Sequence, residues 1–423
     1  MISMNKQIYD FAVIGAGPAG MMAALHAAEC GARVILLEKN RVPGIKLLMT
    51  GKERCNITSS ESDVKNFISV FGKNGKFLMN ALHRFGVRET IDFFHENNLS
   101  TKVERGGRIF PVSDKAEDIQ QLFLKLLKKK NVTVQTNCKI KDIVCKSNII
   151  EKLITDSGEI KAHNYLISTG GLSYPKTGST GDGYRWAKAM GHKIIEPMPA
   201  LTPVMGTLDE KWIKELEGLS LKNVKVSINQ NNRKHDERFG EALFTSNGMS
   251  GPIILDLSKT IGYLLARGRV DLFIDFKPAL DFDKLDKRIL RDLNKYGKKA
   301  MKNLLPELLP GKLIPVMLRL TGIDPEKRAN SVSKEERKRL LLYLKQFPLT
   351  VNSLLGYSKA IITAGGVDLK EIDPKTMCSK IIKNLYFAGE IMDLDGPTGG
   401  YNLQVCWSTG FVAGNSAAER NER

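Results

Sequence analysis

The sequence has few cysteines, and their spacing indicates neither disulfides nor a zinc site. The six cysteines are Cys30, Cys55, Cys138, Cys145, Cys378 and Cys406, and no two of them form a CxxC pair. We therefore expect reduced thiols, which weighs against a redox-active disulfide. His163, His192 and His235 also lack the spacing of metal ligands, so no metal site is predicted.

Long apolar runs are absent as well. No segment has 18 uninterrupted apolar residues, and the opening MISMNKQIYD lacks both a long apolar run and a small-residue cleavage site. These absences predict a cytoplasmic protein without a membrane partner. A length of 423 residues with 42% hydrophobic residues predicts a soluble globular protein of two or three domains.

Acidic residues are in deficit. The chain has 64 Lys and Arg against 46 Asp and Glu, a net charge of +18, and residues 281–345 alone have 17 basic against 9 acidic residues. Such charge suits nucleic acid, a membrane surface or anionic small molecules. No recognition helix, zinc knuckle or aromatic-interleaved basic strip accompanies it, so a solvated basic face is favoured over nucleic-acid binding, which stays open.

The most informative segment is residues 10–39, DFAVIGAGPAGMMAALHAAECGARVILLEK. It predicts a short buried strand at residues 8–14 that ends in the motif Gly15-x-Gly17-x-x-Gly20. In this motif the first glycine permits a tight turn, the second lets the backbone approach a diphosphate, and the third lets a helix pack against the strand. The spacing therefore predicts a dinucleotide-binding turn.

The residues after the turn agree with this interpretation. A helix is predicted from about Pro18 to Cys30, and its N-terminal amides would attract phosphate. A second strand at residues 33–37 delivers Glu38, 18 residues after Gly20, where a carboxylate can bond both ribose hydroxyls of adenosine and disfavours a 2′-phosphate. Together these features make FAD the leading cofactor.

Further strands are predicted along the first half of the chain. Runs at residues 132–135, 139–145, 149–155 and 159–163 predict a meander, and NYLISTGG at residues 164–171 predicts a separate strand that returns to the sheet. The small residues that end this strand would lie at the carboxyl edge of the sheet, where ligands bind in open α/β folds.

The C-terminal region carries a second cofactor signal. A strand is predicted at residues 385–388, Gly389 and Glu390 follow it directly, and residues 396–403 lead into a final helix rich in small residues. A helix N-terminus that faces the pyrimidine end of a flavin favours the negative charge gained there on reduction. The two ends of the chain are thus predicted to hold opposite ends of one FAD.

Between about residues 196 and 355 the pattern changes to prolines, strand-like runs at residues 224–229 and 270–276, and basic helices. This change predicts an insertion. The predicted domains are an FAD-binding domain at 1–195 plus 356–423, a β-rich substrate domain at 196–280, and a basic helical subdomain with the return to the FAD domain at 281–355.

Several longer motifs support a family assignment. The segments KLLMTGKERCNIT, RIFPVSDKAEDI, STGGLSYPKTGSTGDGY, GEALFTSNGMSGPIILDLS, ITAGGVDLKEIDPKTM and YFAGEIMDLDGPTGGYNLQ resemble the bacterial flavoproteins of the BaiN or YhiN type, to which aminoacetone oxidase is similar. This resemblance implies an α/β fold, an FAD-binding Rossmann-like domain of the two-dinucleotide-binding type, interrupted by a β-barrel-like domain and a helical domain. It also implies an NAD(P)/FAD-dependent oxidoreductase.

Two departures from the family pattern stand out. Where such proteins often read GGGRCN or GKGRCN, this chain has Glu53 in place of a glycine. Where they read FTHxGxSGP, this chain has Ser246 in place of the histidine. If that histidine is an acid or base in relatives, this protein uses another group, because an unperturbed serine does not exchange protons near neutral pH.

The candidate site residues follow from these motifs and from the resemblance. The predicted cofactor-binding residues are Gly15, Gly17, Pro18, Ala19, Gly20, Glu38, Lys39, Lys46, Gly51, Arg54, Cys55, Asn56, Ile140, Thr169, Gly170, Gly171, Gly389, Glu390, Thr398, Gly399, Gly400, Tyr401, Asn402 and Leu403. The catalytic residues are left open, with Tyr174, Asn247 and Tyr401 as candidates.

KTGSTGDGYRWAKAMG is not a second nucleotide fingerprint, because the spacing of Gly178, Gly181 and Gly183 is wrong. Reduced pyridine nucleotide would therefore have to reach the flavin directly. The predicted function is an FAD-dependent oxidoreductase with hydride transfer at flavin N5, namely an NAD(P)H-linked reductase of a small organic substrate. The alternatives are an oxygen-using amine oxidase and, in another class, a basic flavoprotein that binds or modifies RNA. The oligomeric state is not predicted.

Overall fold

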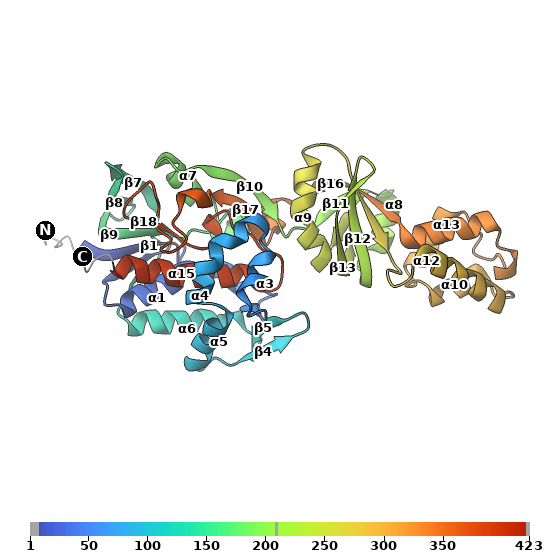
Figure 1. Ribbon diagram of the computed structural model, residues 1–423, viewed down its shortest axis with the longest axis horizontal. Coiled ribbons are helices and arrows are strands. Elements are labelled where there is room, and N and C mark those ends of the chain that lie inside the picture. Colours follow the sequence, from blue (N-terminus) through green and yellow to red (C-terminus); the bar gives the residue numbers. More distant parts are fainter. Residues whose placement is uncertain (1–7, 208–209, 420–423) are drawn as a thin grey trace. The chain divides into compact units, whose positions relative to one another are not determined.

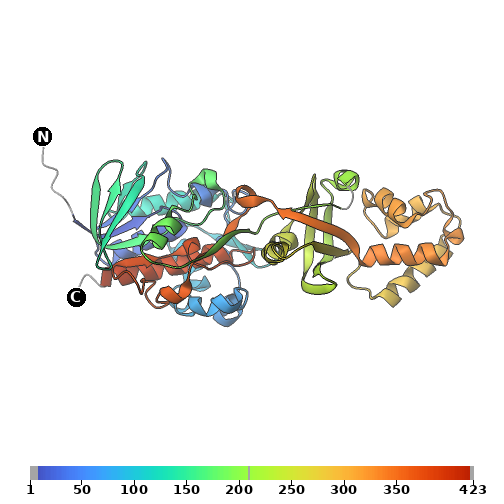
Figure 2. The same ribbon diagram turned by 90° about the horizontal axis from the view of Figure 1, so that it is seen from above.

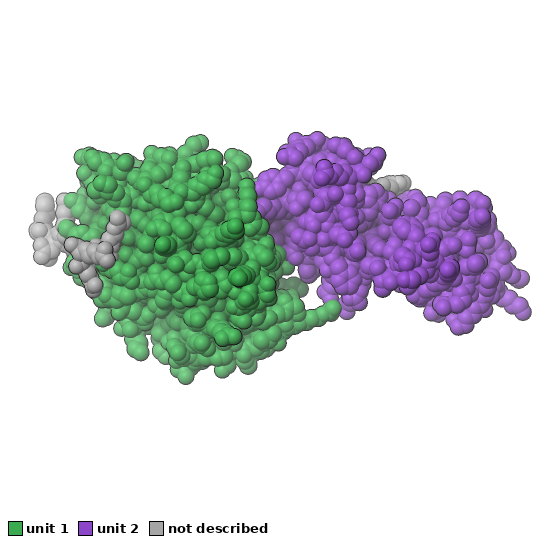
Figure 3. Space-filling model, viewed as in Figure 1, with its two compact units in different colours: residues 1–198, 361–423 green, residues 199–360 purple. Residues whose placement is uncertain are grey.

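The computed structural model describes residues 8–207 and 210–419 and divides into two compact units (Figures 1 and 3). Residues 1–198 and 361–423 belong to unit 1, and residues 199–360 belong to unit 2. The substrate role assigned to the inserted residues stays a prediction. No helix within the described ranges is long and apolar enough to cross a membrane.

Unit 1 is built on a parallel sheet in the order β6-β2-β1-β9-β18. Its central strands are buried runs of apolar residues, as expected when both faces of a parallel sheet are covered. The strands are β1 (Ile8–Ile14), β2 (Val34–Leu37), β6 (Thr133–Gln135), β9 (Glu159–Ile167) and β18 (Leu385–Phe387). The sheet confirms the predicted Rossmann-like core.

One strand differs from the prediction. Residues 159–163 and the returning strand were predicted as two elements, but β9 runs unbroken from Glu159 to Ile167. Its first residues pair antiparallel with β8 (Ile149–Thr155), and from Lys161 onward it pairs parallel with β1. The strand changes partner without a turn, so the meander of β7 (Ile140–Lys146) and β8 extends directly from the central sheet.

Helices and smaller sheets complete unit 1. A small antiparallel sheet has the order β3-β5-β4, and β10 pairs with β17. The helices are α1 (Pro18–Glu29), α2 (Ile45–Leu48), α3 (Val64–Ser69), α4 (Met79–Arg84), α5 (Val87–Glu96), α6 (Ala116–Lys129), α7 (Asp182–Ala189) and α15 (Tyr401–Glu419). The remaining strands are β3 (Thr58–Ser59), β4 (Thr101–Glu104), β5 (Arg108–Pro111), β10 (Ile194–Ala200) and β17 (Ile362–Val367).

The first and last helices of unit 1 lie in direct backbone contact. A Cβ atom at Gly410 of α15 would lie 2.4 Å from the Ala19 carbonyl oxygen of α1, and one at Gly414 would lie 2.3 Å from the Ala23 carbonyl oxygen. Only hydrogen atoms fit in these positions. One turn before Gly410 on α15, the Trp407 ring stacks on Phe123 of α6 with ring centroids 5.3 Å apart.

Unit 2 combines a closed antiparallel barrel with helices. The barrel has the order β11-β14-β13-β12-β15-β16, and it confirms the predicted β-barrel-like part. Its strands are β11 (Val204–Thr207), β12 (Ser220–Gln230), β13 (Arg233–Thr245), β14 (Gly248–Ser250), β15 (Val270–Asp275) and β16 (Phe347–Leu354). Along β15 buried residues alternate with half-buried ones, which is the period of a strand with one face on a core.

The helical part of unit 2 lies in sequence between β15 and β16. Its helices are α10 (Phe282–Lys295), α11 (Met301–Leu304), α12 (Leu313–Thr321) and α13 (Lys334–Lys345), and α8 (Glu210–Leu216) and α9 (Pro252–Leu265) accompany the barrel. Figure 2 shows α10, α12 and α13 at one end of the unit, with β16 running from them into the barrel. Thus the strand that closes the barrel follows the basic helices in the chain.

The contact between α1 and α15 gives a stability prediction. Alanine normally stabilises a helix relative to glycine by about 1 kcal/mol. We expect Gly414→Ala to do the opposite and to lower the free energy of unfolding by about 1–3 kcal/mol, because the new methyl group meets backbone that cannot rotate away. The measurement is the urea midpoint of unit 1 in the apoprotein. Gly17→Ala, also in unit 1, is the control, since nothing lies within 4 Å of its Cβ position and its φ of −81° suits alanine. An unchanged midpoint for Gly414→Ala would contradict the packing described here.

Candidate functional site

The turn between β1 and α1 has the geometry that a dinucleotide fingerprint requires. Gly15 has φ +102°, a conformation that side chains rarely adopt, and a Cβ there would lie 2.7 Å from the Ser168 carbonyl oxygen. A Cβ at Gly20 would lie 1.9 Å from the Gly15 carbonyl oxygen, so the helix packs directly on the turn. Nothing lies within 4 Å of a Cβ at Gly17. The backbone at Gly17 is therefore open to a ligand. At Gly15 and Gly20 other backbone atoms of the protein occupy the space that a side chain would need.

Glu38 is held at the end of β2 by the same turn. Its side chain is 8% exposed, and its Oε2 accepts a hydrogen bond from the Ala16 amide at 3.0 Å. Its Oε1 accepts from the amide and the side-chain Nδ2 of Asn40 at 2.9 and 2.8 Å. A carboxylate has about four acceptor positions, so it keeps capacity for ribose hydroxyls while its orientation is fixed.

These elements border a cleft of about 950 Å³, including the space open to solvent at its mouth. The predicted cofactor residues that line it are Gly15, Gly17, Pro18, Ala19, Glu38, Lys39, Lys46, Ile140, Thr169, Gly170 and Glu390. The predicted residues that do not line it are Gly20, Gly51, Arg54, Cys55, Asn56, Gly171, Gly389, Thr398, Gly399, Gly400, Tyr401, Asn402 and Leu403. Contact of either group with a cofactor stays a prediction.

One side of the cleft comes from a segment that sequence reasoning set aside. Thr177, Gly178, Ser179, Thr180 and Asp182 line the cleft, although their glycine spacing is not that of a fingerprint. Lys39 Nζ joins this segment to the end of β2 through Asp182 at 2.8 Å and Thr180 at 2.6 Å. The place of this segment in the chain could have predicted its part in the cleft. It follows the carboxyl end of β9, and ligands bind at the carboxyl ends of strands in such sheets.

Two buried polar atoms in the cleft wall have no hydrogen-bond partner among the residues that the structure describes. They are Thr169 Oγ1 and Trp186 Nε1, and the Trp186 side chain is 7% exposed. A buried indole N–H that donates to nothing costs about 1–3 kcal/mol, which a ligand acceptor would recover. The open backbone at Gly17, the fixed Glu38 carboxylate and these unpaired groups fit the sugar and diphosphate chemistry of FAD.

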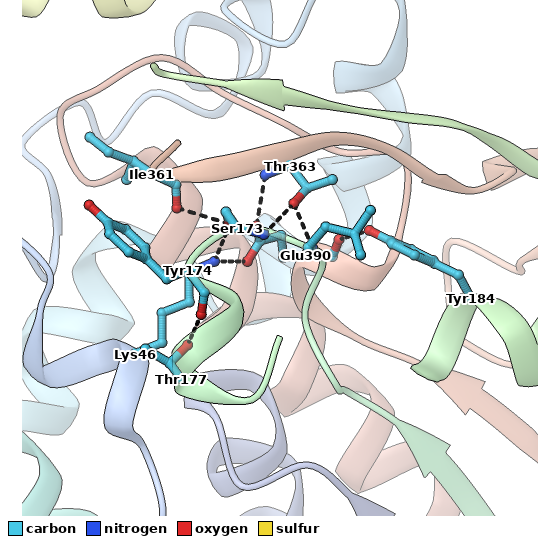
Figure 4. A network of polar contacts seen from close by, with 9 residues as sticks. Lys46, Ser173, Tyr174, Thr177, Tyr184, Ile361, Thr363 and Glu390 are labelled. Carbon is cyan, nitrogen blue, oxygen red and sulfur yellow. Dashed lines mark hydrogen bonds and ion pairs between the residues drawn. The ribbon is translucent and has the colours of Figure 1, made fainter. Parts of the chain in front are cut away.

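A polar network closes the cleft around Glu390 (Figure 4). Lys46 Nζ lies 2.6 Å from Glu390 Oε2 and donates to Ser173 Oγ at 2.6 Å. Glu390 Oε1 accepts from Ser173 Oγ at 2.9 Å and from the Thr363 amide at 2.8 Å. The Thr363 hydroxyl accepts from the Leu172 and Ser173 amides at 2.8 and 3.0 Å. This network joins four separate stretches of unit 1 at one carboxylate.

The three catalytic candidates are not among the described residues that line the cleft. Tyr174 is beside the network, with φ 52° and ψ 59°, and Figure 4 shows its phenol pointing away from Glu390. Tyr401 begins α15 and packs against Phe67 with ring centroids 4.8 Å apart. Asn247 lies exposed in the turn between β13 and β14 of unit 2, next to Ser246. Their catalytic roles stay predictions.

The loop that departs from the family pattern is strained. Glu53 has φ +66°, the left-handed conformation that favours the glycine found in relatives. The neighbouring Arg54 is paired with Glu104 at 2.8 Å and Asp114 at 3.3 Å, and its guanidinium lies 4.1 Å from the centre of the Phe110 ring. Arg54 is thus already neutralised within the protein.

The loop before α15 is closed by its own contacts. Asn402 Oδ1 accepts from the Gly396 amide at 2.8 Å, and its Nδ2 donates to the Gly396 carbonyl at 2.9 Å. A Cβ at Gly400 would lie 2.3 Å from the carbonyl carbon of Thr58. The helix start at Tyr401 is therefore held against β3, and its predicted approach to a flavin ring stays a prediction.

Cys406 is the one thiol of α15 and it borders the cleft beside Gly389 and Glu390. Burial raises the pKa of Cys406 to about 12, and burial likewise raises the pKa of Cys55 to about 12. Both therefore stay protonated near neutral pH. Within the described ranges, no group of His, Cys, Asp and Glu side chains forms a metal site.

Comparison with known proteins places the chain among Rossmann-type proteins. A family model described as the HI0933-like protein Rossmann domain matches residues 9–416. The chain is 32% identical over 413 residues to 3-dehydro-bile acid delta(4,6)-reductase of Clostridium scindens, covering 96% of this chain and 98% of that protein. It is 30% identical over 405 residues to ribosomal RNA dihydrouridine synthase of Escherichia coli, covering 96% of each chain.

Solved structures share the fold at low sequence identity. A 3-ketosteroid delta1-dehydrogenase from Sterolibacterium denitrificans matches with a TM-score of 0.54 and 12% identity, over 98% of this chain and 100% of that one. A 3-ketosteroid-delta4-(5alpha)-dehydrogenase from Rhodococcus jostii RHA1 matches with a TM-score of 0.53 and 14% identity, over 99% of this chain and 98% of that one. These matches concern the fold.

The second and third glycines of the motif, Gly17 and Gly20, give a paired prediction. We expect Gly17→Ala to weaken FAD binding by at least about tenfold, or about 1.4 kcal/mol, because its methyl group enters the open space while its φ of −81° suits alanine. The apoprotein should keep its melting temperature. Gly20→Ala should instead lower that melting temperature, since its methyl group meets the Gly15 carbonyl. FAD titration by fluorescence quenching and thermal unfolding separate the two, and equal FAD affinity in Gly17→Ala and the wild type would exclude a diphosphate site at this turn.

The two thiols with raised pKa, buried Cys55 and half-buried Cys406, give a second prediction. In the native protein, iodoacetamide at pH 8 should modify exposed Cys30 at least about ten times faster than Cys55 or Cys406, because the thiolate is the nucleophile. Peptide mapping by mass spectrometry measures each rate. Cys30→Ser is the control and should remove the fast site. Rapid modification of Cys406 would show a reactive thiol beside the cleft.

Proposed function

The chain belongs to the HI0933-like family and is an FAD-dependent oxidoreductase, and from that premise we propose that it is a reductase that saturates a carbon–carbon double bond conjugated to a carbonyl group. The observation that carries this proposal is the chemistry shared by two relatives that align over nearly the whole chain. Their substrates differ in size and kind, so what they share is the reaction.

The printed names of these relatives describe related bonds. A 3-dehydro steroid with a double bond at carbon 4 is an enone, and a delta(4,6) compound extends that conjugation. Dihydrouridine differs from uridine by saturation of the bond between C5 and C6, which is conjugated to the C4 carbonyl. In both cases two electrons and two protons add to a double bond that its carbonyl group makes electrophilic.

The cleft residues would bind and orient the cofactor. FAD, when bound, supplies the two-electron redox chemistry that amino-acid side chains lack. Glu38 would bond the ribose hydroxyls, the amides at the start of α1 would face the diphosphate, and Trp186 Nε1 would donate to a cofactor acceptor. Lys46 would hold Glu390 in place at the far part of the cleft through their 2.6 Å ion pair.

We propose NAD(P)H as the electron donor. The sequence has one GxGxxG fingerprint, which the FAD site uses, so the donor would bind transiently beside the cofactor. A hydride equivalent from NAD(P)H and a proton from the medium balance saturation of one double bond. An amine as the donor and oxygen as the acceptor would instead make the protein an oxidase.

A second candidate concerns the substrate. One relative points to a free small molecule, and the others point to a uridine within RNA. Uridine within RNA is supported by the net charge of +18 and by 30% identity to two ribosomal RNA dihydrouridine synthases, the second from Haemophilus influenzae over 98% of this chain. A small enone is supported by the 32% identity to the bile acid reductase. Both substrates contain the same reacting group.

Anaerobic mixing tests the proposed reaction. We expect NADH or NADPH to bleach the flavin absorbance of the holoprotein, and a steroid enone or a uridine-containing RNA to restore it in the absence of oxygen. The reason is that an electrophilic double bond conjugated to a carbonyl group can accept a hydride from reduced flavin. The saturated product should appear in mass spectra at about two mass units above the substrate, one for each added hydrogen.

The controls separate the alternatives. Gly17→Ala without bound FAD should show neither bleaching nor product. Bleaching by a small amine, followed by reoxidation only in air, would replace the reductase with an oxidase. Bleaching by NAD(P)H that no enone or RNA reverses would refute the proposed substrate class while leaving the cofactor assignment intact.

A further inference from the structure

The helical part of unit 2 carries a cluster of cations that the cofactor site does not use. Lys295 ends α10, Lys298 and Lys299 follow in the next turn, and Arg328 comes from the segment after α12. All four side chains belong to exposed residues. They are called here the Tyr296 basic cluster, after the aromatic ring between them.

Backbone pairing brings the two segments of the cluster together. Ala300 and Arg328 form an antiparallel bridge, and the Ala329 amide donates to the Lys299 carbonyl at 2.9 Å. The Asn330 amide donates to the Gly297 carbonyl at 3.2 Å. The two backbone segments that carry these cations are therefore adjacent in the folded unit.

Tyr296 draws two ammonium groups to the same ring. Lys299 Nζ lies 4.4 Å and Lys295 Nζ 4.9 Å from its ring centre. A tyrosine ring attracts cations through its quadrupole, which offsets part of their mutual repulsion. The ring therefore concentrates positive charge at one place on the surface.

Nearby carboxylates do not neutralise the cluster. Asp292 is paired with Arg291 at 3.3 Å and Arg288 at 3.6 Å, while Glu326 is paired with Lys302 and Glu336 with Lys327 at 2.8 Å. Among the residues that the structure describes, Lys295, Lys298, Lys299 and Arg328 have no ion-pair partner. The cluster is a site of four uncompensated positive charges.

We propose that the Tyr296 basic cluster binds the phosphate backbone of structured RNA and thereby helps to hold an RNA substrate on the enzyme. This inference rests on the second substrate candidate of the proposed function. Lysine and arginine contacts to phosphate supply most of the sequence-independent affinity for nucleic acid. Tyr296 itself is half-buried against the core of unit 2, so its part in the site is to hold the two ammonium groups close together.

RNA suits this surface better than a membrane does. Peripheral membrane binding combines basic residues with apolar side chains that enter the lipid. The two segments of the cluster, residues 295–300 and 327–330, contain none of the exposed large hydrophobic residues of the described chain. The cluster thus offers charge and one aromatic ring without an apolar anchor.

The test compares two variants of equal charge. One replaces Lys295, Lys298, Lys299 and Arg328 with Gln, and the matched control replaces Lys125, Lys128, Lys129 and Lys141 of unit 1, four exposed lysines outside the cluster, with Gln. The probe is a uridine-containing RNA hairpin, and its dissociation constant for each holoprotein is measured by fluorescence anisotropy over a range of salt. Circular dichroism and melting temperatures establish that each variant is folded.

We expect the cluster variant to bind the hairpin at least about tenfold more weakly and to reduce the slope of log K against log salt by about 3, close to one unit per lost phosphate contact. The control variant should bind as the wild type does. A variant with Arg in place of the three lysines should keep full affinity, which also covers the case in which the Gln variant does not fold.

Three results would overturn the proposal: no binding of the hairpin by the wild type at low salt, equal loss in both Gln variants, or cluster-dependent binding to phosphatidylserine vesicles without binding to RNA. Flavin reduction by NAD(P)H and turnover of a small enone are measured on the same samples. If these persist while RNA binding fails, the surface proposal is wrong and the reductase stands. If NAD(P)H does not reduce the flavin while RNA binding persists, the surface proposal stands and the reductase is wrong.

Discussion

The close approach of α1 and α15 is the constraint on which unit 1 depends. Gly410 and Gly414 let the backbone of the last helix lie directly against the carbonyl groups of Ala19 and Ala23. The first helix starts at the dinucleotide turn, and the last helix follows the strand and loop that contain Glu390. Their contact therefore fixes the two ends of the chain to each other, and the walls of the cleft keep their spacing because these helices cannot separate.

The Glu390 network adds a second constraint at the same cleft. A carboxylate that is mostly removed from water needs partners, and Lys46, Ser173 and the Thr363 amide supply them. These partners come from α2, the loop after β9 and the start of β17. The packing of two helices and the hydrogen bonds to one carboxylate thus each hold the polar lining of the cleft in place within unit 1.

Local patterns in the sequence were sufficient to predict many of the strands and helices of unit 1. Alternation of buried strand, glycine turn and helix over residues 8–37 predicts β1, α1 and β2, because each depends on neighbours within a few residues. The unbroken course of β9 was not predictable in this way, since a strand that exchanges an antiparallel for a parallel partner shows no break or turn at the exchange. The periodicity of hydrophobic residues indicates which face of a strand is buried, but it does not indicate which strand pairs with it.

Only those residues of the candidate site that belong to a local sequence motif were predicted. Glu38 and the glycines belong to a motif of fixed spacing, whereas Thr177 to Asp182 and Trp186 reach the cleft only because the chain returns across the sheet edge. The unpaired Trp186 Nε1 has no signature in the sequence at all, because its isolation depends on the residues folded around it. Likewise, the neutralisation of Arg54 required carboxylates that lie 50 and 60 positions further along the chain.

The pairing of β10 with β17 has a consequence for how this architecture varies. The two strands connect unit 1 with unit 2, and they approach so closely that a Cβ at Gly365 would lie 2.5 Å from the Glu196 carbonyl oxygen. An insertion whose entry and exit are tied together adds little loop-closure entropy, which grows only slowly with length. The oxidoreductase core can therefore tolerate a change in the length of the whole intervening module at little cost in stability, because the two ends of the module stay paired.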